Sequence, residues 1–129
     1  MARPKVDIGL DPARPFVEGD TKTLRIAFTR EGQPFDLTGA TVRWGAFPWP
    51  GHQRSMEPES SPFVSKSTAP GGGITIPDPE SGIAYVALTS ADTVGRAGMN
   101  YHEAEAVDAS GNKATVPQGR FLITRQRIV

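Results

Sequence analysis

The amino-acid sequence predicts an all-β fold in which two antiparallel sheets pack face to face. Apolar and polar residues alternate with a period of two along several short segments. Glycine and proline occur 14 and 12 times among 129 residues, and both favour turns over helices. No segment sustains the 3.6-residue apolar period of an amphipathic helix, which argues against architectures that alternate strands with helices.

The first two predicted strands cover 22–29 and 41–47, on either side of a turn at 31–34. Each has one apolar face and one polar face, as expected for a sheet with one side in water. The residues assigned to the core are Leu24, Ile26 and Phe28 in the first strand and Val42, Trp44 and Ala46 in the second.

The remaining predicted strands cover 73–76, 82–89, 99–108, 113–116 and 120–124. The first two of these form a hairpin, and a helical turn capped by Ser90 follows them. In the strand 99–108, burying Glu103 and Glu105 unpaired would be costly, so these face water. The inward residues of these strands are then Ala84, Val86 and Leu88, His102, Ala104 and Ala106, and Phe121 and Ile123.

Roughly seven short strands separated by frequent turns are typical of an immunoglobulin-like antiparallel β-sandwich. We predict this sandwich over residues 16–129, preceded by an extended N-terminal arm over residues 1–15. A long Pro/Gly-rich insert over about 48–73 interrupts it, with one short segment at 63–67. Long loops in compact domains are commonly functional or disordered, so variable function is expected in this insert.

Composition excludes several classes of function. Fourteen basic residues balance fourteen acidic ones, so no net field draws the protein to nucleic acid. Cysteine is absent, which removes disulfides, thiolate metal sites and cysteine nucleophiles. No apolar run resembles a secretion signal or a membrane span, so we expect folding in the cytoplasm where the chain is made.

No motif for catalysis, metal binding or cofactor binding emerges. The two histidines, His52 and His102, are distant in sequence, and no G-x-S-x-G motif offers a nucleophile. Acidic groups at 78–80 and 108–112 lack the spacing of a calcium loop and are explained by turn chemistry. The segment 69–73 lacks the Lys-Ser/Thr pair of a phosphate loop. We therefore predict a protein that is not an enzyme, with no catalytic, metal or cofactor residues.

Four residues are candidates for contact with a partner. Val6, Ile8 and Leu10 alternate in the N-terminal arm, where they predict either a short edge strand or a docking segment that orders on another subunit. Trp49 lies between two prolines in the insert and offers a flat ring for binding. The arm is the expected main docking element. The basic residues Arg120, Arg125 and Arg127 near the end of the chain suit an acidic partner surface.

Two groups of segments carry a resemblance to a known family. The order and spacing of Gly-Asp-Thr, Asp-Leu-Thr-Gly-Ala and Asp-x-x-Gly-Asn are its most specific features. The matching segments are 16–21, 24–26 and 32–42 in the first half, and 82–89, 91–93, 97–98, 101–103, 108–112 and 119–124 in the second. These stretches resemble the phage baseplate upper protein N-terminal domain family and related phage tail and fibre proteins. The resemblance implies an immunoglobulin-like sandwich that docks an appendage onto a phage particle, often in multiple copies.

The sequence thus predicts a bacteriophage virion structural protein, an adaptor of the tail, baseplate or fibre. Its expected partners are other virion proteins, reached through protein–protein contacts after folding in the host cytoplasm, with no nucleic acid and no membrane insertion. Two alternatives stay open. One is a head decoration or head-fibre protein, which differs only in its partner. The other is a carbohydrate-binding receptor-recognition module, for which Trp49 is the supporting residue.

Overall fold

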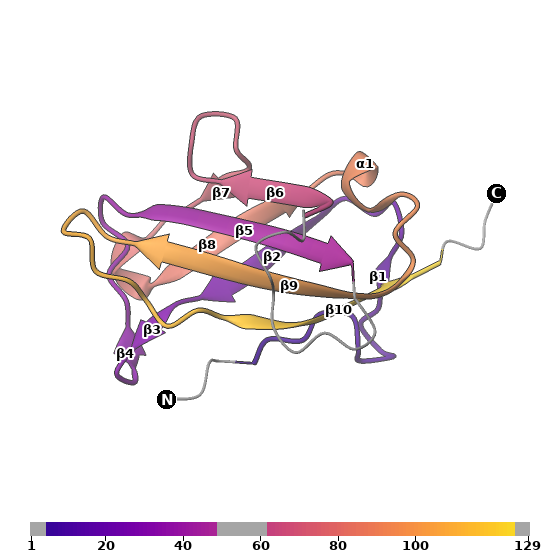
Figure 1. The fold of residues 1–129 in the computed structure, drawn as a ribbon, viewed down its shortest axis with the longest axis horizontal. Helices are drawn as coiled ribbons and strands as arrows, with labels where there is room; N and C mark the ends of the chain where they lie inside the picture. The colour runs from indigo at the N-terminus through magenta and orange to yellow at the C-terminus, as the bar shows by residue number, and fades with distance from the viewer. Residues whose placement is uncertain (1–4, 49–61, 126–129) are drawn as a thin grey trace.

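A computed structural model describes residues 5–48 and 62–125, and these residues form a mostly β structure with packed sheets (Figure 1). The predicted all-β class is confirmed. The strands of the described residues are β1 (Phe16–Val17), β2 (Lys22–Ala27), β3 (Thr29–Arg30), β4 (Gln33–Pro34), β5 (Thr41–Pro48), β6 (Val64–Ser67), β7 (Ile74–Thr75), β8 (Ile83–Leu88), β9 (Gly98–Val107) and β10 (Gln118–Thr124). A 3₁₀ turn, η1 (Pro79–Ser81), and one helical turn, α1 (Ser90–Thr93), complete the set.

Two of the sheets form the two layers of the body. The larger sheet has the order β1-β10-β9-β5-β6, and the smaller has the order β2-β8-β7. In Figure 1 the larger sheet lies in front of the smaller one. All pairs within these sheets are antiparallel except β1 with β10. A separate two-stranded ribbon joins β3 to β4.

The apolar faces predicted from the alternation are the ones that the fold buries. The exposed fractions of the core side chains on β2, β5, β8, β9 and β10 are all below a tenth. Phe121 lies at the centre of an aromatic group, with its ring centroid 5.0 Å from that of Phe16 and 6.1 Å from that of Trp44. Edge-to-face packing of this kind adds to the free energy gained by burial. The outward orientation of Glu103 and Glu105 is also confirmed, since both are only partly buried.

The predicted hairpin of 73–76 and 82–89 is present as β7 and β8, which pair antiparallel. The chain between them makes η1 and then turns at Gly82, whose φ of 76° lies in the left-handed region. A Cβ at this position would lie 2.8 Å from the carbonyl oxygen of Phe28. Glycine is therefore required there both by the backbone angle and by the space.

Two local predictions were wrong. The N-cap of α1 is Thr89, one residue before the predicted Ser90. The Thr89 side chain accepts the N–H of Asp92, whose carboxylate in turn accepts the N–H of Thr89 at 2.7 Å. This reciprocal capping box satisfies two helix-end donors, which a cap at Ser90 would not.

The predicted strand 113–116 does not form. Lys113 makes a single bridge to Val107, whereas the N–H of Thr115 donates to Thr29 of β3 at 3.0 Å. The segment therefore changes partner within two residues, and Pro117 then lacks an N–H for any ladder. The predicted strand 22–29 is similarly divided between β2 and β3.

The turn motifs of the sequence are held by aspartate side chains. Asp36 accepts the N–H and the hydroxyl of Thr38, at 2.9 and 2.7 Å. Asp108 accepts the N–H groups of Ser110 and Asn112, both at 2.9 Å. Hydrogen bonds from Thr38 lower the pKa of Asp36, and those from Asn112 and Ser110 lower the pKa of Asp108. These Asx-type turns explain the aspartates without a bound cation.

Candidate docking surfaces

The N-terminal segment, residues 5–8, lies along one edge of the larger sheet. The N–H of Val6 donates to Gln118 and that of Ile8 to Arg120, both at 2.8 Å, and Leu122 donates back to Ile8 at 2.9 Å. The bridges are parallel, and the indigo segment follows β10 in Figure 1. Val6, Ile8 and Leu10 are half-buried on their own domain. No strand forms over residues 5–10; the segment lies beside β10 through isolated bridges at Lys5 and Ile8.

A buried histidine connects this segment to the core. His102 is fully buried on β9, and its Nδ1 accepts the indole N–H of Trp44 at 3.1 Å. Because the indole is only a donor, Nδ1 carries no proton and Nε2–H donates to the carbonyl oxygen of Val6. Burial lowers the pKa of His102, although the Val6 hydrogen bond and the charge of Asp7 act in the opposite direction. The ring is therefore a neutral structural bridge, and neither of its nitrogens is available as a base.

The segment approaches β10 closely because glycine lies beneath it. A Cβ on Gly119 would lie 2.2 Å from the Val6 carbonyl oxygen, and one on Gly9 would lie 2.2 Å from the Leu122 carbonyl oxygen. Both contacts are too short for any side chain. These two glycines allow the N-terminal segment to close this edge of the sandwich.

An ion pair fixes the same segment from outside. Asp7 accepts the backbone N–H of Arg120 at 2.9 Å and its guanidinium at 3.2 Å. Partial burial raises the pKa of Asp7, but the hydrogen bonds and charge of Arg120 outweigh this and leave the pKa below its ordinary value. Arg120, predicted from sequence as part of a basic surface, is thus engaged within the domain.

The smaller sheet ends at β2, and this edge is not covered in the same way. Phe28 donates to Gly82, so the residues of β2 that exchange hydrogen bonds with β8 are the even-numbered ones. The N–H and C=O groups of Thr23, Arg25 and Ala27 consequently point away from β8. Within residues 5–48 and 62–125, no backbone hydrogen bond reaches these three residues. They form the open edge of β2.

A groove of about 390 Å³ separates this open edge from the N-terminal segment. Its lining combines apolar side chains, among them Ile8, Leu24 and Ile26, with the cations Arg14, Lys22 and Arg25. Lys22 also donates to the carbonyl oxygen of Pro15 at 2.9 Å and lies over the ring of Phe16. The single carboxylate in the lining, Asp7, is the one paired with Arg120. We refer to this groove as the β2 groove.

A second hollow, of about 530 Å³, lies on the outer face of β6, β5 and β9. It forms over Gly45, where a Cβ would meet the ring of Phe47 at 3.4 Å and the side chain of Pro62 at 3.6 Å, both ordinary van der Waals contacts. Glu103 and Ser65 also line it, and Arg43 pairs with Glu105 at one side. The hollow combines the Phe47 ring with polar groups.

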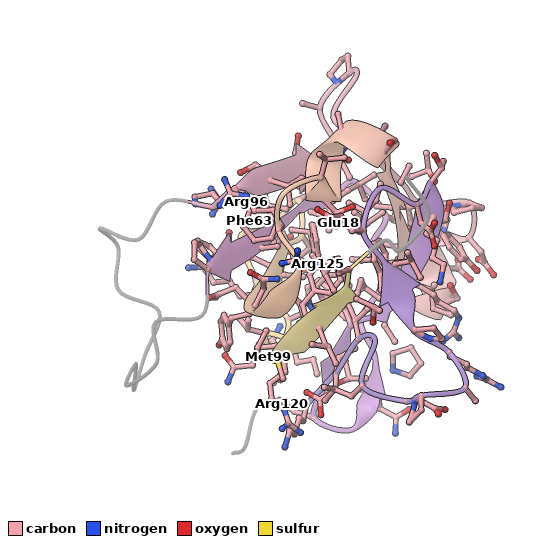
Figure 2. All side chains as sticks on the ribbon, turned by 90° about the vertical axis from the view of Figure 1, so that its right-hand side faces the viewer. Glu18, Phe63, Arg96, Met99, Arg120 and Arg125 are labelled. Carbon is pink, nitrogen blue, oxygen red and sulfur yellow. The ribbon has the colours of Figure 1, made fainter. Side chains whose placement is uncertain are left out.

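The end of the sandwich seen in Figure 2 is closed by contacts within the domain. Glu18 accepts the N–H of Gly95 at 2.6 Å, and the guanidinium of Arg96 lies 4.7 Å from the ring centroid of Phe63. Thr93, fully buried, accepts the N–H of Gly19. Arg125 is exposed at this end. Of the three arginines that the sequence suggested as a basic surface, Arg120 is paired with Asp7 and Arg125 is exposed. Arg127 lies outside the described residues.

Of the four sequence candidates, the structure places Val6 and Ile8 beside β10 and leaves Leu10 half-buried just after them, while Trp49 lies outside the described residues. A contact of these residues with a partner stays a prediction. Sequence reasoning missed the open edge of β2, although charges such as Lys22 and Arg25 are typical of edge strands. Among the described residues there is no group of three or more metal-binding side chains, and no helix has the length and apolarity of a membrane span.

Comparison with known proteins adds no relative: no protein-family profile matches the chain, and no curated protein matches it significantly.

Proposed function

We propose that this protein is a non-enzymatic structural protein of a bacteriophage virion, an adaptor of the tail, baseplate or fibre that docks other virion proteins. The sequence resemblance described above supports this proposal. An immunoglobulin-like arrangement of the two sheets belongs to the same proposal, with the all-β fold as its support. The chain is expected in several copies per particle after synthesis in the host cytoplasm.

The observation that carries the proposal is the open edge of β2. Three consecutive outward positions, Thr23, Arg25 and Ala27, present unpaired backbone groups beside a groove. Unpaired sheet edges are templates for strands of other chains, and adding a strand is a common mode of protein–protein docking. An adaptor needs such a surface, whereas a catalyst needs an available acid, base or nucleophile. The described histidine, His102, has both ring nitrogens engaged in hydrogen bonds.

The proposal is tested by locating the protein in purified particles. Mass spectrometry of gradient-purified virions, with heads and tails separated, is expected to find the chain in the tail fraction at several copies per particle. Recovery in the head fraction alone would favour the head decoration or head-fibre alternative. Absence from both fractions would contradict a structural role in the virion.

The hollow over Gly45 favours one second candidate, a carbohydrate-binding receptor-recognition module. The ring of Phe47 offers a stacking surface and Glu103 and Ser65 offer polar groups beside it. This function predicts glycan-array binding that is weakened by Phe47→Ala or by Trp49→Ala. The matched control is Tyr85→Ala, a half-buried aromatic residue on the other sheet that lines neither groove.

A further inference from the structure

We propose that the open edge of β2 binds an extended segment of a partner protein in which apolar and acidic residues alternate, and that this segment enters the β2 groove as an added strand. This inference rests on the proposed adaptor function and specifies its docking site and partner chemistry. It follows from the backbone, the apolar lining and the charge of the groove.

The backbone groups of the open edge are spaced to receive an added strand. The N–H and C=O groups of Thr23, Arg25 and Ala27 lie in one row, two residues apart, which is the spacing of a sheet ladder. Leaving such groups without a partner is costly wherever water is excluded, so a strand added here gains several main-chain hydrogen bonds. A volume of about 390 Å³ is within the usual range of binding clefts.

The lining explains why alternate residues of the partner would be apolar. Successive side chains of an added strand point to opposite faces of the sheet. One set would face Ile8, Leu24 and Ile26, which belong to or pack against the core of the sandwich. Apolar side chains in this set would extend the existing core and gain burial energy.

The positive charge of the groove favours acidic residues among the outward-facing side chains of the partner strand. The outward-facing neighbours of an added strand include Arg25, and Arg14 and Lys22 also line the groove. No ion pair engages Arg14 or Arg25 in the described part of the chain, and Asp7 is neutralised by Arg120. Opposite charges on neighbouring strands stabilise a pair and like charges destabilise it. Glutamate or aspartate at the outward positions of the partner segment would pair with these cations.

The same charges argue against a second copy of this chain as the occupant. Pairing β2 with β2 of another protomer in the antiparallel register centred on Arg25 would place the Arg25 side chains of the two copies opposite each other. Neighbouring cations of one sign oppose this pairing. The occupant is therefore a segment of different sequence.

The inference is tested with synthetic peptides and the isotope-labelled full-length chain. The probe is a capped peptide of roughly six residues, a common strand length, that alternates valine and glutamate. Titration followed by amide NMR shifts is expected to move the signals of Thr23, Arg25 and Ala27 most. A peptide of the same length that alternates valine and lysine is expected not to bind.

Two variants separate the backbone contribution from the charge contribution. Arg25→Glu should weaken binding of the valine–glutamate peptide about tenfold or more, since it replaces attraction by repulsion. Thr23→Pro removes an outward N–H and leaves the hydrogen bonds to β8 in place, so it should also weaken binding. Arg30→Glu makes the same charge change on β3, outside the groove, and should leave binding unchanged.

Circular dichroism establishes that each variant is folded, and Arg25→Glu decides the question if Thr23→Pro does not fold. The inference is overturned if the valine–glutamate peptide causes no shifts at β2, if Arg25→Glu leaves its affinity unchanged, or if sedimentation shows the chain dimerising through this edge. Incorporation of Arg25→Glu into particles at the wild-type level would also reject the docking site while leaving the virion function intact. Peptide binding by a chain absent from particles would retain the site and reject the virion function.

Discussion

The β10 edge of the larger sheet and the β2 edge of the smaller sheet differ in whether their backbone groups are paired. On the β10 side, residues 5–8 and β1 run parallel to the edge strand and satisfy its backbone groups. On the β2 side, Thr23, Arg25 and Ala27 present the same kind of groups with no partner among the described residues. The groove between these two sides is lined by residues of both.

The difference shows how a sheet edge is closed and how one is kept open. Closing the β10 side requires glycine at 9 and 119 and a neutral His102 that reaches the Val6 carbonyl. The β2 edge instead carries Lys22 and Arg25, charges that discourage pairing with identical chains. One side therefore contributes to stability, whereas the other leaves backbone groups available for a partner.

The largest effect is expected in the core that supports the closed side. Phe121→Ala removes the ring that packs on Phe16 and Trp44, and should lower the free energy of unfolding by about 3–5 kcal/mol. Urea denaturation followed by tryptophan fluorescence measures this loss. Leu122→Ala, at the next and less buried position of β10, is the control and should cost much less. Equal losses for the two variants would contradict the assigned orientation of the strand.

Gly119→Ala should detach the N-terminal segment. The new Cβ would overlap the Val6 carbonyl, and overpacking of this kind costs about 1–3 kcal/mol. Limited trypsin digestion should then cleave after Lys5 faster than in the wild type, since Arg14 is followed by proline and is not a trypsin site. Thr23→Ala on the open side is the comparison and should change neither stability nor cleavage. Unchanged cleavage of Gly119→Ala would show that the segment does not depend on this contact.

The His102 bridge predicts a pH dependence of stability. Its pKa is lowered in the folded state, so the unfolded chain binds the proton more readily. The stabilisation that neutral His102 contributes is complete above the pKa of about 6.5 that histidine has in the unfolded chain. It is lost as the pH falls towards the lower pKa of the folded state, and the free energy of unfolding then decreases by up to about 1.4 kcal/mol per pH unit. Urea unfolding between pH 8 and 5 should show this slope. His102→Gln should flatten it.

Asp7→Asn should have a smaller effect, about 1 kcal/mol, because it weakens charge-assisted hydrogen bonds at a partly exposed site. The lowered pKa of Asp7 gives the sign of the acid response. This contribution is present above the unfolded pKa, near 4, and is lost as the pH falls through the lower folded value. The difference in Tm between the wild type and Asp7→Asn, measured by thermal denaturation, should therefore be larger at pH 7 than at pH 3. Asp11→Asn, which lies outside this ion pair, serves as the control.

The smallest effect on stability is expected at the open edge. Arg25→Glu should change the free energy of unfolding by less than about 0.5 kcal/mol, since its side chain is exposed and has no ion-pair partner among the described residues. Chemical denaturation measures this value. A loss as large as that of Gly119→Ala would mean that the β2 edge is structural and would weaken its assignment to docking.

The buried faces were predictable because alternation is a local signal. Leu24, Ile26 and Phe28 indicate their face within a few residues, and the cost of burying Glu103 fixes the orientation of β9. The cap at Thr89 was missed because Thr89 and Ser90 are both good N-caps and only the position of Asp92 distinguishes them.

The two edges were not predictable from alternation, because pairing depends on distant parts of the chain. The period of Val6 and Ile8 indicates a strand but not its partner, and Asp7 meets Arg120 across 113 positions. One signal was available: an isolated glycine within a strand pattern, such as Gly119, often marks close approach of another backbone. The openness of β2 follows only from the order of strands in the sheet.

Native-state hydrogen exchange of the free protein tests the contrast between the edges most directly. We expect slow exchange for the amides of Val6, Ile8 and Leu122, which are hydrogen-bonded at the closed side, and fast exchange for those of Thr23, Arg25 and Ala27. Protection of the three β2 amides, or rapid exchange of Val6 and Ile8, would contradict this contrast.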